Sequence, residues 1–328
     1  MPLDPLCSVF CSRLQTDVSL ARYTTARLGG PADALLVAES VDELADTASQ
    51  LWNLDIPFVI LGGGSNVLIS DAGIREVVIL NRAKEVHIDG QASPPTVWAG
   101  AGANFGSMAR QAASLGLGGM EWAAGIPGTV GGAVFSNAGA HGGDVAVSLL
   151  MVEILPRDGR REQWPVEKMG YTYRSSILKR KPGDVVVGKM LPQDWGPGGV
   201  PSILKRKPGD VVILSAKFRL EHSNLQAVQE KLDEFSARRH STQPPGASMG
   251  SIFKNPPGDY AGRLIEAAGL KGTRIGGAEI SPKHANFFVN HGGCTAAEIF
   301  ALIQLARDTV FEKFGVKLEC EVELIGEW

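Results

Sequence analysis

The chain has 328 residues, of which 44% are hydrophobic and 20% charged, a composition typical of a folded protein with two or three domains. Its formal net charge of −3 offers no general positive field, which argues against nucleic acid as a partner. The sequence has no apolar run of about 18 residues and no basic, apolar leader. We therefore expect a soluble, cytoplasmic protein with no membrane partner.

Cysteine and glycine usage narrows the class further. The cysteines are Cys7, Cys11, Cys294 and Cys320, which form neither a Cys-x-x-Cys pair nor a zinc-binding spacing. We therefore expect free thiols in a reducing compartment and no metal site. The 40 glycines make up about 12% of the chain, against roughly 7% in an average protein. They are clustered, which suggests loops whose backbone approaches a ligand closely.

The first two thirds of the chain alternate strand and helix patterns. A strand is predicted at 34–40 and a helix at 40–55, for which Ser40 is a suitable N-cap, and the segment 56–70 is predicted as a buried strand that ends in a glycine turn. The next predicted elements are strands at 77–81, 86–90 and 96–100, a helix at 104–115, and strands at 150–156 and 211–220. The last third is richer in helix, with helices predicted at 224–240, 258–268 and 295–314 and short strands at 286–290 and 317–325. We place a domain boundary near residue 220.

An identical stretch, SILKRKPGDVV, occurs at 176–186 and again at 202–212. Because a functional repeat would have diverged, a recent tandem duplication, or an artefact of assembly, explains it better than a repeat architecture. Only one copy should be needed by the fold. The Gly- and Pro-rich segment 188–201 is predicted to loop out at the surface, and the KRK of each copy to form a solvated hairpin tip.

Two glycine turns are candidates for contact with phosphate. LGGGSNVLIS at 61–70 follows a buried strand, and successive N–H groups in such a turn can hold a pyrophosphate, although a purely structural turn fits as well. It is not a Walker loop, because no Gly-Lys-Ser/Thr follows, and Val67 takes the place of the third Rossmann glycine. GAGANFG at 100–106 resembles the Rossmann fingerprint, but it comes late in the chain and Glu121 lies in a loop. We do not favour a Rossmann domain.

The strongest glycine signal is GIPGTVGGAVFSNAGAHGG at 125–143. Its turns leave room for a planar or phosphorylated group against bare backbone, and Thr129, Ser136 and Asn137 supply hydrogen-bonding side chains. The run is aperiodic and contains apolar residues, which excludes a collagen-like segment or a linker. Two such loops on separate strands suit a dinucleotide bound without a Rossmann fold.

Several charged residues are candidates for substrate contact. Arg174 lies in YTYRSS at 171–176, although an arginine near a surface strand is usually solvated. Glu319, Glu321 and Glu323 alternate along the last predicted strand and so share one face, a pattern that also fits a polar outer face.

Ser251 and two histidines are further candidates. Ser251 lies in ASMGSIFKNPPGDYAG and lacks the Gly-x-Ser-x-Gly elbow of hydrolases. His284 and His291 lie in SPKHANFFVNHGG, where an isolated histidine is more often a packed or surface residue than a catalyst.

Taken together, these segments resemble one family. TTARLGGPADAL, LGGGSNVLISDAG, GIPGTVGGAVFSNAGAHGG, YTYRSS, GSIFKNPPGDYAGRLIEAAGLKG and SPKHANFFVN follow in the order seen in the UDP-N-acetylenolpyruvoylglucosamine reductases, also called UDP-N-acetylmuramate dehydrogenases. The resemblance runs from about residue 20 to residue 326. The compact C-terminal motifs are similar to the subclass that lacks an extra tyrosine-bearing substrate loop.

The resemblance implies an α+β fold. Residues 1–220 would form an FAD-binding domain of the PCMH or vanillyl-alcohol-oxidase type, with subdomains at about 1–84 and 85–220. Residues 221–328 would form an α+β substrate-binding domain, whose last strand could return to the first subdomain. NADPH would reduce FAD, which would reduce the enolpyruvyl ether of UDP-N-acetylglucosamine-enolpyruvate to the lactyl ether for peptidoglycan synthesis. A monomer is expected.

The resemblance also assigns roles to residues. Ser251 matches the family's proton donor, and Arg174 and Glu321 match the residues that polarise the substrate carboxylate and stabilise the intermediate. Cys320 stands where the family commonly has proline. The residues implied to bind FAD are Thr24, Thr25, Gly29, Gly30, Gly62, Gly63, Gly64, Ser65, Asn66, Gly125, Ile126, Pro127, Gly128, Thr129, Gly131, Gly132, Ser136 and Asn137. Those implied to bind the substrate are Tyr173, Arg239, Gln243, Lys254, Asn255 and His284.

Two other hypotheses stay open at this stage. The chain could be another flavoenzyme on the same fold, such as an alcohol or lactone oxidase that uses oxygen. It could also be a nucleotide-binding protein whose duplication has disabled the site.

Overall fold

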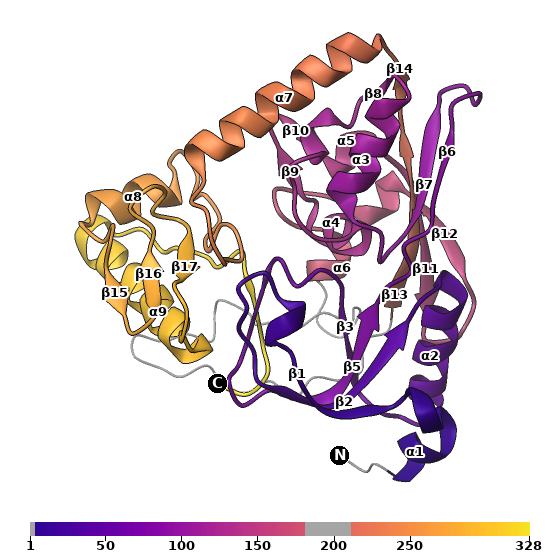
Figure 1. Cartoon of the computed structure of the whole chain (residues 1–328), viewed down its shortest axis with the longest axis horizontal. Helices are drawn as coiled ribbons and strands as arrows, with labels where there is room; N and C mark the ends of the chain where they lie inside the picture. Colours follow the sequence, from indigo (N-terminus) through magenta and orange to yellow (C-terminus); the bar gives the residue numbers. More distant parts are fainter. Residues whose placement is uncertain (1–3, 181–210) are drawn as a thin grey trace.

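The computed structural model describes residues 4–180 and 211–328. These residues form three packed units, seen in Figure 1: a first unit at 4–84, a second unit at 85–180 and 211–242, and a third unit at 243–328. Within the described ranges no helix has the length and apolar character that crossing a membrane requires.

The first unit is a largely parallel sheet covered by one long helix. Its elements are α1 (Asp4–Phe10), η1 (Cys11–Arg13), β1 (Gln15–Ser19), η2 (Ala21–Tyr23), β2 (Pro31–Ala38), α2 (Val41–Asn53), β3 (Phe58–Leu61), β4 (Val67–Ile69) and β5 (Ile74–Asn81). The strand order is β1-β2-β5-β3, with β2 and β3 parallel to β5. Helix α2 packs on this sheet because Leu44, Ala48 and Leu51 recur at helical spacing. The Ser40 hydroxyl caps its first turn by accepting from the Glu43 N–H.

The second unit is an antiparallel sheet whose helices gather on one side (Figure 1). Its elements up to residue 222 are β6 (Val86–Asp89), β7 (Thr96–Gly100), α3 (Phe105–Ser114), β8 (Leu117–Gly118), η3 (Glu121–Ala123), α4 (Val130–Ser136), β9 (Gly139–Ala140), β10 (Gly143–Asp144), α5 (Val145–Ser148), β11 (Leu149–Pro156), β12 (Glu162–Pro165), η4 (Val166–Met169), α6 (Ile177–Arg180), β13 (Val211–Arg219) and β14 (Glu221–His222). The strand order is β12-β11-β13-β7-β6. In the core the Phe105 ring lies 5.7 Å from the rings of both Trp122 and Phe218.

The long helix α7 (Leu225–Thr242) belongs to the second unit by its packing. Val228 is buried, and Phe235 packs against the core of that unit and stacks on His141 at 4.3 Å. Figure 1 shows α7 running from the second unit towards the third. Helix α7 therefore packs on the unit that precedes it, through Val228 and Phe235, whereas the sequence grouped it with residues 221–328.

The third unit packs two helices around a small sheet. Its elements are α8 (Ala261–Ala267), β15 (Arg274–Ile275), β16 (Ala278–Ile280), β17 (Phe288–Asn290), α9 (Ala296–Phe314) and β18 (Glu323–Ile325). Thr295 and Glu298 form a capping box at the start of α9, and Gly315 ends the helix with a φ of 68°. The chain then returns to the first unit, where β18 pairs in parallel with β4.

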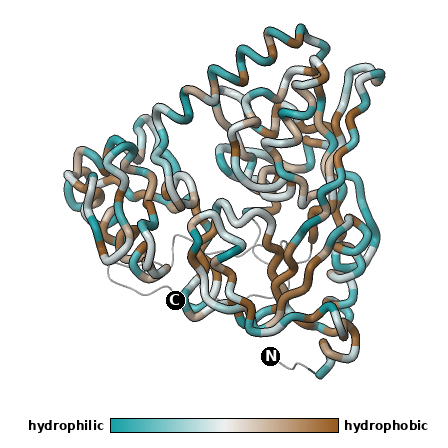
Figure 2. The backbone as a smooth tube through the Cα atoms, in the orientation of Figure 1, coloured by the Kyte–Doolittle hydropathy of each residue, from teal (hydrophilic) through white to brown (hydrophobic). Residues whose placement is uncertain are grey.

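Most predicted elements appear within a few residues of their expected bounds. The strand predicted to end in the glycine turn is β3, and after the turn 62–66 the short strand β4 pairs in a different sheet. The strand expected at 317–325 is reduced to β18. Figure 2 shows the apolar segments concentrated in the strands of the first unit, whereas much of α7 is hydrophilic.

The two copies of SILKRKPGDVV each contribute one end to the described structure. Residues 176–180 of the first copy lead into and form α6, and Val211 and Val212 of the second copy begin β13. The predicted surface loop 188–201 lies outside the described residues. Lys179, the first lysine of the first KRK, is not part of a solvated tip, since its side chain is only 15% exposed.

We expect that removing one copy leaves the fold intact. Deleting residues 181–206 restores a single SILKRKPGDVV between YTYRS and ILSAKF. Leu178 and Val211 both belong to the core of the second unit, and both are kept in the shortened chain. The expected melting temperature, measured by circular dichroism, lies within about 3 °C of the parent value.

The matched control removes both copies, residues 176–212. This deletion takes away Ser176, Leu178, Val211 and Val212, all of which are buried, and should abolish cooperative unfolding. Loss of cooperative unfolding in the shorter deletion as well would show that the fold needs both copies.

Candidate functional site

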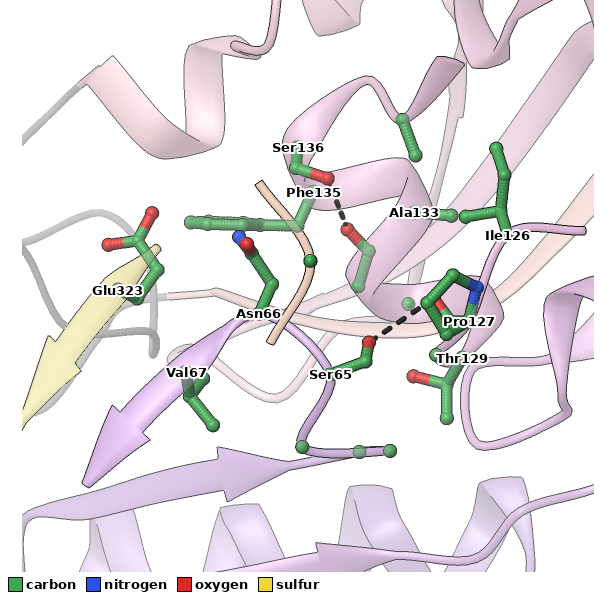
Figure 3. A pocket seen from close by; sticks show the side chains of 18 of the residues that line it. Ser65, Asn66, Val67, Ile126, Pro127, Thr129, Ala133, Phe135, Ser136 and Glu323 are labelled. Carbon is green, nitrogen blue, oxygen red and sulfur yellow. Dashed lines mark hydrogen bonds between the residues drawn. The ribbon is translucent and has the colours of Figure 1, made fainter. Parts of the chain in front are cut away.

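A cavity of about 400 Å³ lies where the three units meet. The first unit contributes the turn 62–66, and the second contributes residues 126–129, 131–133, 135, 136 and 138–140 together with the start of β13, Arg174 and Arg239. The third unit contributes Gln243, the segment 249–251, Glu321 and Glu323. Figure 3 shows the two glycine-rich loops approaching each other across this cavity.

The two glycine-rich loops touch with no room for side chains between them. A Cβ at Gly62 would lie 2.4 Å from the Thr129 Oγ1, and one at Gly128 would lie 2.5 Å from the Ser65 Oγ. The Ser65 hydroxyl donates to the Pro127 carbonyl at 3.2 Å (Figure 3). Because these positions must be glycine, backbone N–H groups of both loops are brought close to whatever fills the cavity. The cradle fits a large planar ring system that carries a diphosphate.

Most residues implied to bind FAD line this cavity. They are Gly62, Gly63, Gly64, Ser65, Asn66, Ile126, Pro127, Gly128, Thr129, Gly131, Gly132 and Ser136. The others lie outside the lining: Thr24, Thr25, Gly29, Gly30, Gly125 and Asn137.

Three of the residues outside the lining support the loops instead. The Thr25 N–H donates to the Gly64 carbonyl at 3.0 Å, and its hydroxyl donates to the Ser248 carbonyl at 2.7 Å. The Thr24 hydroxyl donates to the Leu28 carbonyl at 2.8 Å, within its own turn. A Cβ at Gly30 would lie 2.1 Å from the carbonyl oxygen of Asp71, so glycine is needed for the close packing of these two segments.

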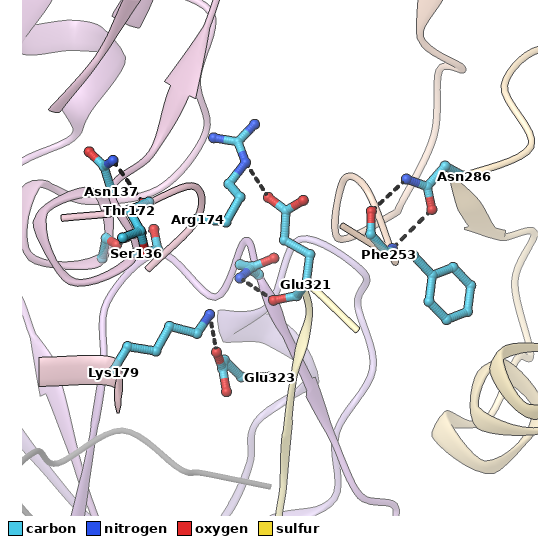
Figure 4. A network of polar contacts seen from close by, with 11 residues as sticks. Ser136, Asn137, Thr172, Arg174, Lys179, Phe253, Asn286, Glu321 and Glu323 are labelled. Atoms are coloured by element: carbon cyan, nitrogen blue, oxygen red, sulfur yellow. Dashed lines mark hydrogen bonds and ion pairs between the residues drawn. The ribbon is translucent and has the colours of Figure 1, made fainter. Parts of the chain in front are cut away.

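Asn137 fastens the segment that carries Arg174. It is buried in the left-handed conformation (φ 49°) at the end of α4, and its Nδ2 donates to the Thr172 carbonyl at 3.1 Å (Figure 4). The hydroxyls of Tyr171 and Ser176 donate to carbonyls near the end of α4 at 2.9 and 2.6 Å. The segment 171–176 is thus held on α4 from three points, which places Arg174 at the cavity.

Arg174 and Glu321 form an ion pair on the cavity wall, with 3.0 Å between Nε and Oε1 (Figure 4). Their side chains are 24% and 18% exposed. Burial raises the pKa of the Glu321 carboxyl, and the positive charges of Arg174, Lys179 and Lys254 oppose that rise. Tyr173 is exposed and absent from the lining, and the Arg174 guanidinium lies 5.6 Å from its ring centre.

Backbone pairing places Ser251 beside Glu321. The Ile252 carbonyl accepts from the Glu321 N–H at 2.8 Å. The buried Asn286 side chain accepts from the Phe253 N–H at 2.9 Å and donates to the Phe253 carbonyl at 2.8 Å, as Figure 4 shows. These bonds hold the turn rigidly, so the Ser251 hydroxyl lines the cavity at a fixed position.

Two of the other residues implied to bind the substrate also reach the cavity. Arg239 and Gln243 lie one helical turn apart at the end of α7 and both line it. The Arg239 guanidinium donates to the Gly125 carbonyl, and burial lowers its pKa.

The remaining three are not in the lining and make contacts within the third unit. The Lys254 ammonium pairs with Glu319 at 3.3 Å. The Asn255 Oδ1 accepts from an N–H in the first turn of α8 at 3.1 Å. The His284 ring packs on Phe287 at 4.8 Å, and burial lowers its pKa.

Sequence reasoning missed a second ion pair at the cavity. Lys179 and Glu323 lie 2.5 Å apart, each with a side chain only 15% exposed, and Glu323 lines the cavity (Figures 3 and 4). The alternation of three glutamates was the available signal, but it was equally consistent with a polar outer face. Apolar lining residues such as Phe135, Met249 and Phe287 carried no signal of their own.

Comparisons with known proteins agree with this architecture. Residues 32–163 match a family model described as an FAD binding domain, and residues 241–325 match the C-terminal domain of UDP-N-acetylenolpyruvoylglucosamine reductase. The reductase of Chloroflexus aggregans is 40% identical over 312 residues, which cover 95% of this chain and 97% of that protein. The reductase of Rubrobacter xylanophilus is 43% identical over 313 residues, with 95% of both chains covered.

A solved structure is similar over the same length. The crystal structure of the reductase from Thermus caldophilus superposes with a TM-score of 0.74 at 33% identity, covering 95% of this chain and all of that one. The α+β architecture is therefore an FAD-binding domain of the PCMH type followed by the reductase C-terminal domain. The chain belongs to the family of UDP-N-acetylenolpyruvoylglucosamine reductases, which are FAD-dependent oxidoreductases.

Proposed function

We propose that this protein reduces the enolpyruvyl ether of UDP-N-acetylglucosamine-enolpyruvate to the lactyl ether of UDP-N-acetylmuramate, with NADPH as the reductant. The observation that carries the proposal is the meeting of Ser251, Arg174 and Glu321 on one wall of a cavity whose other wall is the glycine cradle. A monomer is also proposed. The cytoplasm is proposed as its compartment, where nucleotide-linked precursors and NADPH are available.

The glycine loops at 62–66 and 125–132 would hold FAD. Their backbone N–H groups suit the diphosphate, and the apolar lining suits the ring system. When bound, FAD supplies the two-electron chemistry that links NADPH to the carbon–carbon double bond.

Arg174 would bind and orient the carboxylate of the enolpyruvyl group. A guanidinium can form two parallel hydrogen bonds to a carboxylate, and in a partly buried site this pairing favours negative charge that develops beside it. Because Arg174 Nε is paired with Glu321 in the described structure, the arriving carboxylate would bind the other nitrogens of the guanidinium. Glu321 would then keep the guanidinium in the plane needed for binding.

Ser251 would donate a proton from its Oγ to the carbon that bears the substrate carboxylate. A serine hydroxyl is a weak acid in water, so it can donate only to a strongly basic centre and only when it is well oriented. An enolate is such a centre. The Asn286 bonds to Phe253 supply the orientation by fixing the turn that carries Ser251.

One prediction concerns the purified protein itself. It should be yellow with a flavin absorbance band, and NADPH should bleach this band. Steady NADPH oxidation should require the enolpyruvyl nucleotide. Rapid oxidation of a simple alcohol by oxygen would instead indicate an oxidase on the same fold, and a colourless protein that takes up no FAD would indicate a non-catalytic nucleotide-binding protein.

Another prediction concerns Ser251→Ala. NADPH should bleach the flavin at nearly the parent rate, whereas return of the colour on adding the nucleotide should slow by about 10²- to 10⁴-fold, the usual range for a lost general acid. Stopped-flow absorbance measures both rates. Ser251→Cys keeps a proton donor, so its rate of colour return should lie between those of the parent and the alanine variant. Fast return of colour in the alanine variant would exclude Ser251 as the donor.

The glycine cradle can be tested through FAD retention. In Gly62→Ala the new Cβ meets Thr129 at 2.4 Å, so the loops must separate at a cost of roughly 1–3 kcal/mol. We expect FAD retention on gel filtration to weaken by about tenfold or more. Gly90→Ala is the matched control, because its Cβ meets only Leu117 at 3.6 Å, outside the cavity. Equal FAD retention in both variants would contradict the cradle.

A further inference from the structure

Alternate acids near the C-terminus each have their own cation. Glu319 pairs with Lys254, Glu321 with Arg174 and Glu323 with Lys179. The first pair is at the surface, where the Glu319 side chain is 56% exposed, and such pairs contribute little. The other two are largely buried, and each of them joins the segment 171–180 to the C-terminal segment (Figure 4).

The backbone leaves the two buried acids little freedom. The Asn66 Nδ2 donates to the Glu321 carbonyl at 3.1 Å, and the Asn66 carbonyl accepts from the Glu323 N–H at 3.0 Å. Asn66 is the last residue of the glycine turn 62–66, so both acids are attached to the loop that lines the cavity. Parallel pairing of β18 with β4 fixes the register.

The second unit holds Lys179 in place. It lies in α6, where its N–H donates to the Ser176 carbonyl at 3.1 Å and its neighbour Leu178 is buried in the core of the second unit. The ammonium group is therefore held near the cavity, where a buried cation needs a partner. Glu323 is that partner.

This arrangement separates two cations that could otherwise compete for one acid. Glu321 faces Arg174 from the segment 171–176, Lys179 from α6 and Lys254 from the Ser251 turn. If Glu323 were absent, Lys179 would be drawn to the Glu321 carboxylate or to an anion in the cavity. If Lys179 were absent, the Glu323 charge would be left uncompensated close to Glu321.

We propose that Lys179 and Glu323 are a positioning pair, in which Glu323 occupies Lys179 so that Glu321 pairs with Arg174 alone and keeps the charge state the reaction needs. The inference rests on the proposed function, since it gives the pair a task in binding and reducing the enolpyruvyl group. Neither residue is proposed to touch the reacting atoms.

The test compares the pH–rate profiles of Lys179→Gln and Glu323→Gln for nucleotide-dependent NADPH oxidation. The limb of the parent pH–rate profile that reflects titration of Glu321 is identified with Glu321→Gln, because the slow residual reaction of this variant should lack that limb. In Lys179→Gln the limb should move to higher pH by about one unit, a tenfold change, because a nearby positive charge is lost. In Glu323→Gln it should move to lower pH, because Lys179 is released towards Glu321.

Opposite shifts are the signature that a merely structural pair would not produce. The double variant Lys179→Gln/Glu323→Gln should return the limb close to its parent position, and Lys179→Arg should leave it there. Glu319→Gln is the matched control at the exposed pair and should shift it much less. Equal rate losses without shifts, or shifts in the same direction, would overturn the proposal.

Two further measurements keep the inference separate from the proposed function. A pH titration of the bound FAD absorbance in the same variants needs no nucleotide and should show the same opposite shifts. If the parent protein binds FAD but does not reduce the nucleotide, the proposed function fails while this titration still decides the inference. If Lys179→Gln does not fold, the shifts measured in Glu323→Gln and in the double variant still decide the inference.

Discussion

The return of the C-terminal segment to the cavity is the constraint on which the site depends. Residues 319–325 form backbone hydrogen bonds to the turn that carries Ser251 on one side and to Asn66 and β4 on the other. Because one short segment is bonded to both the first and the third unit, it fixes the acids against the glycine loop and against Ser251. A site assembled from three units would otherwise tolerate movements of an ångström or more, which is enough to impair catalysis.

The two buried ion pairs at the cavity are each neutral before any ligand enters. Arg174 and Lys179 face Glu321 and Glu323, all with side chains less than a quarter exposed. Burying such pairs adds little to stability, because desolvation offsets most of the attraction. Their value is positional, since each charge removed alone would leave its partner unpaired. An anionic substrate then finds an arginine that is already oriented and only partly neutralised, as a preorganised site requires.

The sequence predicted the elements well because the apolar periodicity of α2, α3 and α9 and the apolar strands of the first unit are local properties. It also located the glycine loops, because close backbone approach demands glycine whatever the tertiary context. It grouped α7 with the residues that follow it, since a mostly polar helix gives little indication of which unit it contacts. It could not assign Glu323, because a glutamate facing solvent and one facing a buried lysine have the same pattern. The resemblance implied Asn137 as a flavin contact, and nothing in the sequence indicated the hydrogen bond from its amide to the Thr172 carbonyl that fastens the segment carrying Arg174.

The described ends of the two SILKRKPGDVV copies carry two separate sets of contacts. Arg174 and Lys179 both lie before residue 181, and there each forms one of the two buried ion pairs. The register of β13 with β11 and β7 begins at Val211, after that point. The described residues on either side of 181–210 therefore hold both the ion pairs at the cavity and the pairing of β13. A segment inserted between Arg174 and Lys179 would instead separate the two cations from each other and from their acids.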